Sequence, residues 1–402
     1  MFTTRKITED LIYVGASDRR APLFEGAHPI PLGVSYNNYV LLDEKTVLMD
    51  TADHSVAEQF FANLEHALAG RELDYIVVQH MEPDHSASLK AALCRYPGAR
   101  VVCTAKALTM IGQFTGLDIA GRAQVVKEGN TLETGRHTLQ FIMAPMVHWP
   151  EVMVTYDRAD QTLFSADAFG LFGALDGALF ADEVDFFQDH LSEARRYYAN
   201  IVGKYGTPVQ GLLKKAAGLE IARICPLHGF VWRQDMDKLL AYYDLWSRYM
   251  PEEQGVLIAY ASIYGHTAAA ANAVATGLRQ TGIPCAVYDV SVTDPSYVLA
   301  EMFRYSHLLL AAPTYNNGVF VRMENLLHDV AAHALQNRTV FLMQNGSWAP
   351  TSAAGMKAIL EGCKGFDFAE PVLTLKSALA PAQEDELNAF VDAIAASVGG
   401  NA

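Results

Sequence analysis

Residues 79–86 read Gln-His-Met-Glu-Pro-Asp-His-Ser and follow directly on the apolar run Tyr-Ile-Val-Val at residues 75–78. The apolar run predicts a buried strand that ends at residue 79. Four side chains that bind metals fall within six positions of the loop after it, namely His80, Glu82, Asp84 and His85. Because function gathers at the carboxyl ends of strands in α/β proteins, this stretch predicts a metal site.

The local structure of this stretch follows from its spacing. The alternation of His80, Glu82 and Asp84 predicts that they project from a turn and not from one face of a helix. Pro83 stiffens that turn and prevents a helix from continuing through it. A helix is expected to begin at about Ser86, with Ser86 as its N-cap.

Three more candidate ligands occur at the ends of predicted strands. His148 follows a strand at 139–143, Asp167 follows one at 163–165, and His228 follows Ile224. Each lies beside Gly, Pro or a small residue, which permits a close approach of the backbone to a site. A single histidine at a strand end is more commonly an ordinary polar residue than a ligand. All these elements together, in order, predict a metal site of four His, two Asp and one Glu.

The chain divides near a polar segment at residues 251–255. Before it, short strands and helices mix in a pattern that predicts two sheets flanked by helices. After it, strand and helix alternate regularly, which predicts a doubly wound parallel sheet of five strands. The expected domains are residues 1–250 and 255–402. In the second, strands are expected at 256–260, 286–290, 308–312, 340–344 and near 372–375, with a last helix at 384–397.

Three loops at strand ends of the second domain predict a flavin site. The first combines hydroxyls, a glycine and the start of a helix, which suits a phosphate monoester. The other two carry amides and aromatic rings, which suit a flat polar heterocycle. Neither GxxxxGK nor GxGxxG occurs, which disfavours triphosphate hydrolysis and a Rossmann dinucleotide site. Taken singly, the second and third loops are ordinary turn sequences. The expected contacts are Ser262, Ile263, Tyr264, Gly265, His266 (through its backbone amide more than its ring) and Thr267; Pro313, Thr314, Tyr315, Asn316, Asn317 and Gly318; and Asn345, Gly346, Ser347 and Trp348.

The composition narrows the class of protein. The 402 residues are 51% hydrophobic and 19% charged, with a formal net charge of −15. This is a globular composition, and its acidity argues against nucleic acid or an anionic membrane as the main partner. No run of 18 apolar residues and no N-terminal apolar segment occur, so we expect a cytoplasmic protein without a membrane span. The five scattered cysteines argue against a disulfide framework and are expected to be small core residues. The Tyr197–Tyr198 pair is expected to serve packing. The remaining histidines are expected at surface or ordinary polar positions: His54, His66, His137, His190, His307, His328 and His333.

The first metal stretch resembles that of the metallo-β-lactamase fold, whose zinc hydrolases carry His-x-His-x-Asp-His. This chain departs from that pattern at Glu82, where a carboxylate replaces the second imidazole and favours iron over zinc. With the flavin loops added, the whole chain resembles the flavodiiron proteins. The resemblance implies an N-terminal metallo-β-lactamase-like αββα sandwich, followed by a flavodoxin-like domain, in a mixed α/β and α+β chain.

The resemblance assigns the family's iron ligands to matching residues of this chain, one residue at a time. The resemblance implies a first iron held by His80, Glu82 and His148, and a second held by Asp84, His85 and His228. Asp167 bridges the two. In some members the histidine that matches His85 points away from the metal. The resemblance thus assigns the candidate ligands of both irons.

The resemblance also implies a function. FMN supplies two electrons and two irons supply two more, which suffices to take O2 to water, while coupling two NO to N2O needs two. The implied enzyme is an O2 or NO reductase that protects an anaerobic or microaerobic cell, fed by a separate donor such as a rubredoxin or a reductase. A head-to-tail homodimer, or a dimer of dimers, brings the FMN of one subunit to the irons of the other.

Two rival interpretations stand beside this one. The first is a zinc-dependent hydrolase of the metallo-β-lactamase fold fused to a flavodoxin, against which Glu82 argues. The second is a pure electron carrier with a degenerate metal site, against which the complete ligand set argues. Leu171 and Phe172 replace the Gln-His that many flavodiiron proteins have there, and make the surroundings less polar. The sequence leaves the choice between O2 and NO open.

Overall fold

The computed structural model describes residues 2–400. Internal contacts divide the chain into two compact units, one of residues 1–197 and 207–243 and the other of residues 198–206 and 244–402. The two are described separately below. Within residues 2–400, no helix combines the length and the apolar character that crossing a lipid bilayer requires.

The first unit contains two sheets packed face to face. The larger has the order β1-β2-β7-β8-β9-β10-β11, and the smaller the order β12-β13-β14-β15-β16. Their inner faces share one core of buried apolar residues, among them Leu41, Val77, Phe141 and Phe164. The strands are β1 (Arg5–Lys6), β2 (Leu11–Tyr13), β7 (Tyr39–Leu42), β8 (Thr46–Met49), β9 (Tyr75–Val78), β10 (Arg100–Cys103), β11 (Ala123–Val125), β12 (Thr131–Glu133), β13 (Thr138–Met143), β14 (Met153–Asp157), β15 (Thr162–Phe164) and β16 (Arg223–Cys225).

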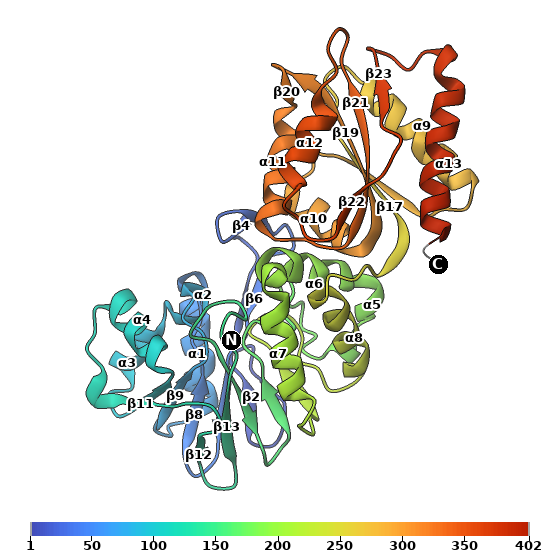
Figure 1. Ribbon diagram of the computed structural model, residues 1–402. Helices are drawn as coiled ribbons and strands as arrows, with labels where there is room; N and C mark the ends of the chain where they lie inside the picture. The colour runs from blue at the N-terminus through green and yellow to red at the C-terminus, as the bar shows by residue number, and fades with distance from the viewer. Residues whose placement is uncertain (1, 401–402) are drawn as a thin grey trace. The chain divides into compact units, whose positions relative to one another are not determined.

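Helices cover the outer faces of both sheets (Figure 1), which makes the expected αββα sandwich. Two short ribbons, β3 with β6 and β4 with β5, complete the unit. The ribbons are β3 (Ala16–Asp18), β6 (Val34–Tyr36), β4 (Leu23–Phe24) and β5 (His28–Pro29), and the helices are α1 (Ala57–Leu68), α2 (Pro83–Ser86), α3 (Leu89–Arg95), α4 (Ala105–Thr115), α5 (Phe186–Asp189), α6 (Leu191–Tyr197), α7 (Gly206–Ala216) and α8 (Met236–Ser247), the last of which runs into the second unit.

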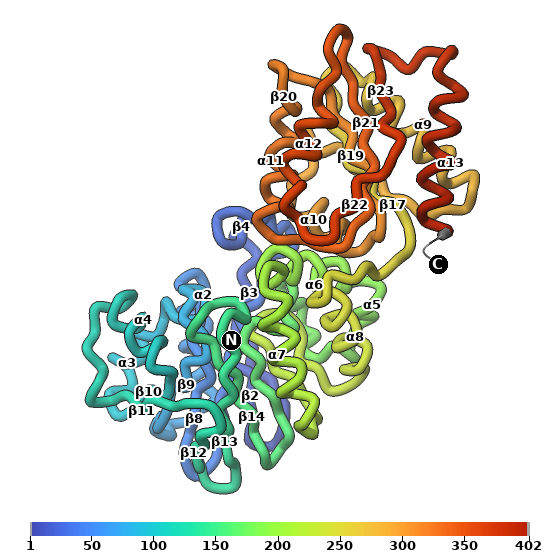
Figure 2. Tube along the Cα trace, in the orientation of Figure 1, coloured from blue at the N-terminus to red at the C-terminus, as the bar shows by residue number. Residues whose placement is uncertain are grey.

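The second unit is a doubly wound sheet with the strand order β18-β17-β19-β21-β22. All pairs on that path are parallel, β23 also pairs with β21 in parallel, and β20 forms a short antiparallel hairpin with β19. In Figure 2 the part of this unit from residue 244 to residue 400 runs from yellow to red, and α9 and α13 lie side by side on one face. The strands are β17 (Glu253–Tyr260), β18 (Cys285–Asp289), β19 (Tyr305–Tyr315), β20 (Gly318–Val319), β21 (Arg338–Asn345), β22 (Phe366–Phe368) and β23 (Leu373–Leu375), and the helices are α9 (His266–Gln280), α10 (Pro295–Arg304), α11 (Val321–Ala332), α12 (Ser352–Leu360) and α13 (Glu384–Gly400).

The structure corrects the expectation for residues 83–86. Pro83 does not prevent a helix but starts α2, because proline suits the first helical position, where no N–H is needed. Asp84 and His85 therefore lie on a short helix. Ser86 is not an N-cap: it is the last residue of α2, and its hydroxyl donates to the carbonyl of Met81 at 2.8 Å.

Three further expectations are wrong in part. His137 and His307 are fully buried, and hydrogen bonds to neighbouring polar side chains make that burial possible. Cys94 is exposed on α3 and is not a core residue. The helix expected at 190–204 ends its α-helical part at Tyr197 and continues as a π-helical segment at Tyr198–Val202.

Candidate metal and flavin sites

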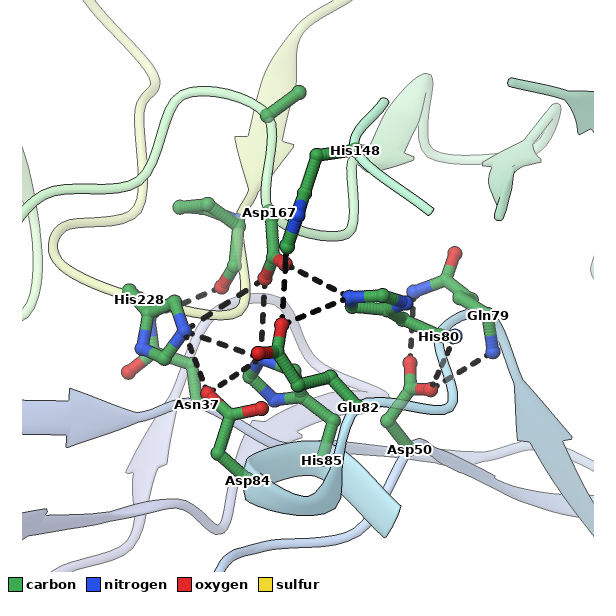
Figure 3. Close-up of polar contacts among 12 residues, drawn as sticks. Asn37, Asp50, Gln79, His80, Glu82, Asp84, His85, His148, Asp167 and His228 are labelled. Atoms are coloured by element: carbon green, nitrogen blue, oxygen red, sulfur yellow. Dashed lines mark hydrogen bonds and ion pairs between the residues drawn. The ribbon is translucent and has the colours of Figure 1, made fainter. Parts of the chain in front are cut away.

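Four loops of the first unit bring the seven candidate ligands together. These loops follow β9, β13, β15 and β16, and Figure 3 shows their side chains converging on one point. Six of the seven are buried, and Asp84 is half-buried. Chain segments that are distant in the sequence thus form one compact polar cluster inside an apolar sandwich.

The cluster consists of two groups. In the first, the ligating atoms of His80, Glu82, His148 and Asp167 all lie within 4.8 Å of one another. The second contains Asp84, His85 and His228, again within 4.8 Å. Nitrogen and carboxylate oxygen donors in such groups are the ligands that iron and zinc take.

Asp167 lies between the two groups. Its Oδ2 is 3.1 Å from Nε2 of both His80 and His148, and its Oδ1 is 3.0 Å from Nε2 of His85. The same Oδ1 is 3.7 Å from Nε2 of His228. One carboxylate that presents a different oxygen to each group has the geometry of a bridge between two ions.

The spacing of the donors within each group also fits an ion. Glu82 Oε2 lies 3.3 Å from His80 Nε2 and 3.0 Å from His148 Nε2. Asp84 Oδ2 lies 3.2 Å from Nε2 of both His85 and His228. Two ligand atoms that each lie about 2.1 Å from an ion, with a right angle between them at the ion, are about 3.0 Å apart. Both groups therefore have the size of a metal site.

Buried oxygens within the cluster lack hydrogen-bond donors. Within residues 2–400, both carboxylate oxygens of Asp84 and Oδ1 of Asp167 accept no hydrogen bond. Asp84 Oδ2 and Asp167 Oδ1 face histidines of the same cluster as ion-pair partners. A buried anionic oxygen without a hydrogen-bond donor is costly, and a bound cation removes that cost. The donor set and these oxygens together fit two bound cations.

Electrostatics keep the carboxylate of Asp167 ionised. Burial raises the pKa of Asp167, but the positive charge of His85 and His80 outweighs burial and holds that pKa well below its usual range. Burial lowers the pKa of His148, but the hydrogen bonds that its ring donates to Asp167 and Glu82 outweigh burial and raise the pKa to about 9. A metal ion that binds at Nε2 of His148 therefore displaces a proton.

Backbone and side-chain contacts fix the loops that present the ligands. Asp50 accepts from the N–H of Gln79 at 2.8 Å and from the N–H of His80 at 3.3 Å. The loop of His228 is held by Asn37, whose amide donates to the carbonyls of Pro226 at 3.0 Å and Gly229 at 2.8 Å. The ligand positions are thus set by buried polar residues of the sandwich.

Sequence reasoning missed four residues beside the cluster. Glu151 accepts from Nδ1 of His80 at 2.8 Å, and it was detectable as a carboxylate three residues after His148. Tyr197 serves packing as expected, but one of the rings that it packs on, at 5.4 Å, is that of His228. Phe24 lies 5.5 Å from His228, and Glu25 shares a cavity of about 620 Å³ with Glu82 and Asp84. Nothing in the sequence indicated Tyr197, Phe24 or Glu25.

Another cluster of the first unit has the composition of a metal site but is already neutralised. His137, Asp157 and Asp160 lie close together. Arg136 donates to Asp160 at 2.9 Å, and His137 is 2.8 Å from Asp157. The guanidinium supplies the positive charge there, so the cluster acts as an ion-pair network.

The second unit has a cavity of about 490 Å³ at the carboxyl ends of β17, β19 and β21. Thr267 is buried at the start of α9, and Gly265 caps that helix in a left-handed conformation with φ of 89°. Of the sixteen expected contacts, Gly265, Tyr315 and Gly318 belong to the same loops but do not line the cavity. The lining consists of Ser262, Ile263, Tyr264, His266, Thr267, Pro313, Thr314, Asn316, Asn317, Asn345, Gly346, Ser347 and Trp348, joined by Ala349 and Ser377.

The chemistry of this cavity fits a flavin mononucleotide. The start of α9 with its hydroxyl groups suits the phosphate. Tyr264 is 89% exposed and Trp348 is 90% exposed, which is rare for aromatic side chains unless they stack on a ligand or partner. Asn345 donates to Thr267 Oγ1 at 3.2 Å and to the carbonyl of Ser377 at 2.8 Å, which ties the first and third loops together.

Comparisons with known proteins agree with both sites. The family model described as ODP family beta lactamase matches residues 34–229, and the flavodoxin model matches residues 258–389. The chain is 31% identical over 350 residues to an anaerobic nitric oxide reductase flavorubredoxin of Aeromonas hydrophila, a match that covers 85% of this chain and 70% of that protein. It is also 31% identical over 385 residues to a protein of the same name from Escherichia coli O1:K1, covering 94% and 78%.

Solved structures show the same fold over both units. The flavodiiron protein from Giardia intestinalis has a TM-score of 0.92 at 28% identity, with 99% of this chain and 98% of that chain covered. Rubredoxin oxygen:oxidoreductase from Desulfovibrio gigas has a TM-score of 0.92 at 26% identity, with 99% of each chain covered. With its two-part donor cluster and its flavodoxin-like cavity, this chain belongs to the flavodiiron protein family.

Proposed function

We propose that this chain is an oxidoreductase that reduces O2 to water, NO to N2O, or both, with FMN and a non-haem diiron centre as cofactors. The observation that carries the proposal is the position of Asp167, whose two oxygens face two separate groups of donors. A carboxylate between two complete donor groups fits a two-metal centre, and Glu82 in the first group favours iron over zinc there. The names of the relatives, nitric oxide reductase flavorubredoxin and rubredoxin oxygen:oxidoreductase, support the reaction class.

The assignment of ligands is part of this proposal. His80, Glu82 and His148 would hold the first iron and Asp84, His85 and His228 the second, with Asp167 between them. The cavity of the second unit would hold FMN through the loops at 262–267, 313–317 and 345–348. When bound, the flavin and the iron pair supply the electrons and the binding site for a small diatomic.

The residues of this chain would control what reaches the irons. The ring centre of Phe172 lies 5.4 Å from that of Phe24 and 5.1 Å from that of Tyr197. The rings of Phe24 and Tyr197 in turn pack on His228. This apolar wall would cover the His228 side of the second group, and such surroundings suit small neutral gases. Burial of the ligands in the sandwich keeps the donor geometry fixed.

The zinc hydrolase alternative is not favoured by the surroundings of Glu82. Its carboxylate touches both histidines of its group, so it occupies a ligand position and not the rim of the site. An added anionic ligand suits iron that cycles between two oxidation states better than zinc.

Several finer points of the proposal come from the family resemblance. A head-to-tail homodimer, or a dimer of dimers, would bring the FMN of one subunit near the irons of the other. A separate protein, such as a rubredoxin or a reductase, would deliver electrons. A cytoplasmic location stays a prediction from five scattered cysteines that form no CxxC pair.

The test is a steady-state assay of the anaerobically purified, iron- and FMN-loaded protein with a reduced rubredoxin as donor. We expect consumption of O2, NO or both, and loss of that consumption in Asp167→Ala with the flavin still bound. A protein that is loaded with both cofactors but turns over neither gas, and that instead hydrolyses thioesters or β-lactams with zinc, would refute the proposal.

A further inference from the structure

Three of the four imidazole ligands, His80, His85 and His228, differ in the group that meets their second ring nitrogen. Nδ1 of His80 lies 2.8 Å from Oε1 of Glu151, whereas Nδ1 of His228 lies 2.7 Å from the backbone carbonyl of Ser35. Nδ1 of His85 is buried and has no hydrogen-bond partner within residues 2–400. Of these three ligands, only the first therefore has a carboxylate as the hydrogen-bond partner of its second ring nitrogen.

Glu151 is held in place for this contact. Glu151 is 2% exposed, and its Oε1 also accepts a hydrogen bond from the N–H of Met81 at 2.9 Å. Its own carbonyl accepts from the hydroxyl of Thr104 at 3.1 Å. Glu151 forms its ion pair with His80. The other carboxylate oxygen of Glu151, Oε2, has no hydrogen-bond donor among the described residues. A buried carboxylate with one imidazole partner acts mainly on that imidazole.

The consequence for a bound metal follows from general ligand chemistry. A carboxylate behind an imidazole keeps the proton on Nδ1, so that Nε2 presents its lone pair, and it makes that lone pair a stronger donor. Nε2 of His80 is the atom that faces Glu82 and Asp167. The first group therefore has the charge of Glu82 and the added influence of Glu151. The second has the charge of Asp84, a backbone carbonyl at Nδ1 of His228 and, within the described part of the chain, no hydrogen-bond partner at Nδ1 of His85.

From this asymmetry we infer that Glu151 is a positioning residue that makes the first metal position bind its ion more tightly than the second. The inference rests on the proposed diiron function and deepens it, because it makes the two irons unequal. The first position fills first and holds its ion in the higher oxidation state more strongly.

The experiment uses metal-free, flavin-containing full-length protein titrated anaerobically with Co²⁺, whose visible absorption reports each binding step. Two backgrounds separate the positions: His228→Ala leaves the first group complete, and His148→Ala leaves the second complete. We expect Glu151→Gln to weaken Co²⁺ binding about 10- to 100-fold in the first background and to leave the second unchanged. Glutamine keeps the shape and an acceptor oxygen but removes the charge.

Two further variants serve as controls. Glu151→Asp keeps the charge and is expected to recover part of the lost affinity, which a role in packing alone does not predict. Asp157→Asn removes a carboxylate from His137, a buried pair of the same 2.8 Å length at a histidine outside the proposed ligands. It is expected to leave both Co²⁺ affinities unchanged.

The inference is overturned if Glu151→Gln binds Co²⁺ as wild type does in the His228→Ala background. It is also overturned if the affinity falls equally in both backgrounds, since that indicates a general loss of structure. Failure of the proposed function has a different signature: wild-type protein then binds fewer than two Co²⁺, or His148→Ala and His228→Ala each fail to lose one.

Discussion

At the scale of single residues, Glu82 separates this chain from zinc hydrolases of the same fold. Its carboxylate lies 3.0 Å from His148 Nε2 and 3.3 Å from His80 Nε2, so a histidine in its place enters the first donor group directly. That exchange removes one negative charge and provides a softer ligand, which favours zinc.

We therefore predict that Glu82→His lowers iron content, raises zinc occupancy and reduces O2 or NO turnover about 10- to 100-fold. Metal analysis and steady-state rates measure the effect. FMN content is the internal control, because the flavin loops belong to the other unit and should be unaffected. Wild-type iron content and turnover in this variant would mean that Glu82 is not a ligand.

A second residue, His307, makes a prediction about pH. Burial lowers the pKa of His307 to about 4, and its ring contacts the hydroxyls of Ser306 and Ser397. The unfolded chain binds a proton on this histidine below about pH 6.5, while the folded chain does not until about pH 4. Its contribution to stability is therefore complete above pH 6.5 and is lost as the pH falls toward 4.

In urea unfolding followed by circular dichroism, we expect the free energy of unfolding of wild type to drop between pH 7 and pH 5 by about 2 kcal/mol more than that of His307→Gln. Other titrating groups are common to both proteins and cancel in the difference. Parallel pH profiles for the two proteins would show that His307 is not held neutral by burial.

At the scale of elements, the short helix α2 determines where Asp84 and His85 lie. The hydroxyl of Ser86, at its last position, donates to the carbonyl of Met81 and so closes the loop between the strand and the helix. Ser88, two residues on, is equally buried, but its hydroxyl has no partner among the described residues. The two serines thus form a matched pair in one segment.

We predict that Ser86→Ala lowers the free energy of unfolding by about 1–3 kcal/mol, since it leaves a buried carbonyl without its donor. Ser88→Ala should be neutral or slightly stabilising, because it removes a buried hydroxyl that makes no hydrogen bond. Thermal or chemical unfolding of the metal-free proteins measures both changes. Equal losses in the two variants would contradict the hydrogen bond of Ser86.

The same elements show how far the sequence predicts this protein. The strands and the gathering of candidate ligands at strand ends were predictable, because apolar runs followed by polar side chains place His80 after β9 of the larger sheet and His228 after β16 of the smaller sheet. The start of α2 was misjudged, since proline ends a helix that precedes it but suits the first position of one that follows. Tyr197 could not be predicted, because its approach to His228 depends on the packing of α6 and not on any spacing in the chain.

At the scale of the whole molecule, the proposed head-to-tail dimer predicts complementation between two inactive chains. Glu82→Ala keeps the flavin loops, and Ser262→Ala with Thr267→Ala keeps the metal ligands. A mixed dimer of these two chains contains one intact flavin and iron pair across its interface. Short-range electron transfer within one subunit cannot be restored in this way, because each chain has one broken site.

We expect separately tagged mixed dimers, purified through both tags, to regain up to about half of the wild-type rate, while each parent homodimer stays near zero. The measurement is NO or O2 consumption with a reduced rubredoxin. Parent homodimers mixed after assembly and assayed at once serve as the control for subunit exchange. Inactive mixed dimers with full cofactor loading would contradict the intersubunit arrangement.

The central claim is that Asp167 bridges two irons held by two separate groups of side chains. Electron paramagnetic resonance of the partly reduced, iron-loaded protein tests it most directly, because only bridged irons couple their spins. The account predicts a signal from a spin-coupled, mixed-valent pair in wild type and its loss in Asp167→Ala. A spectrum of isolated high-spin iron in wild type, with two irons bound per chain, would contradict it.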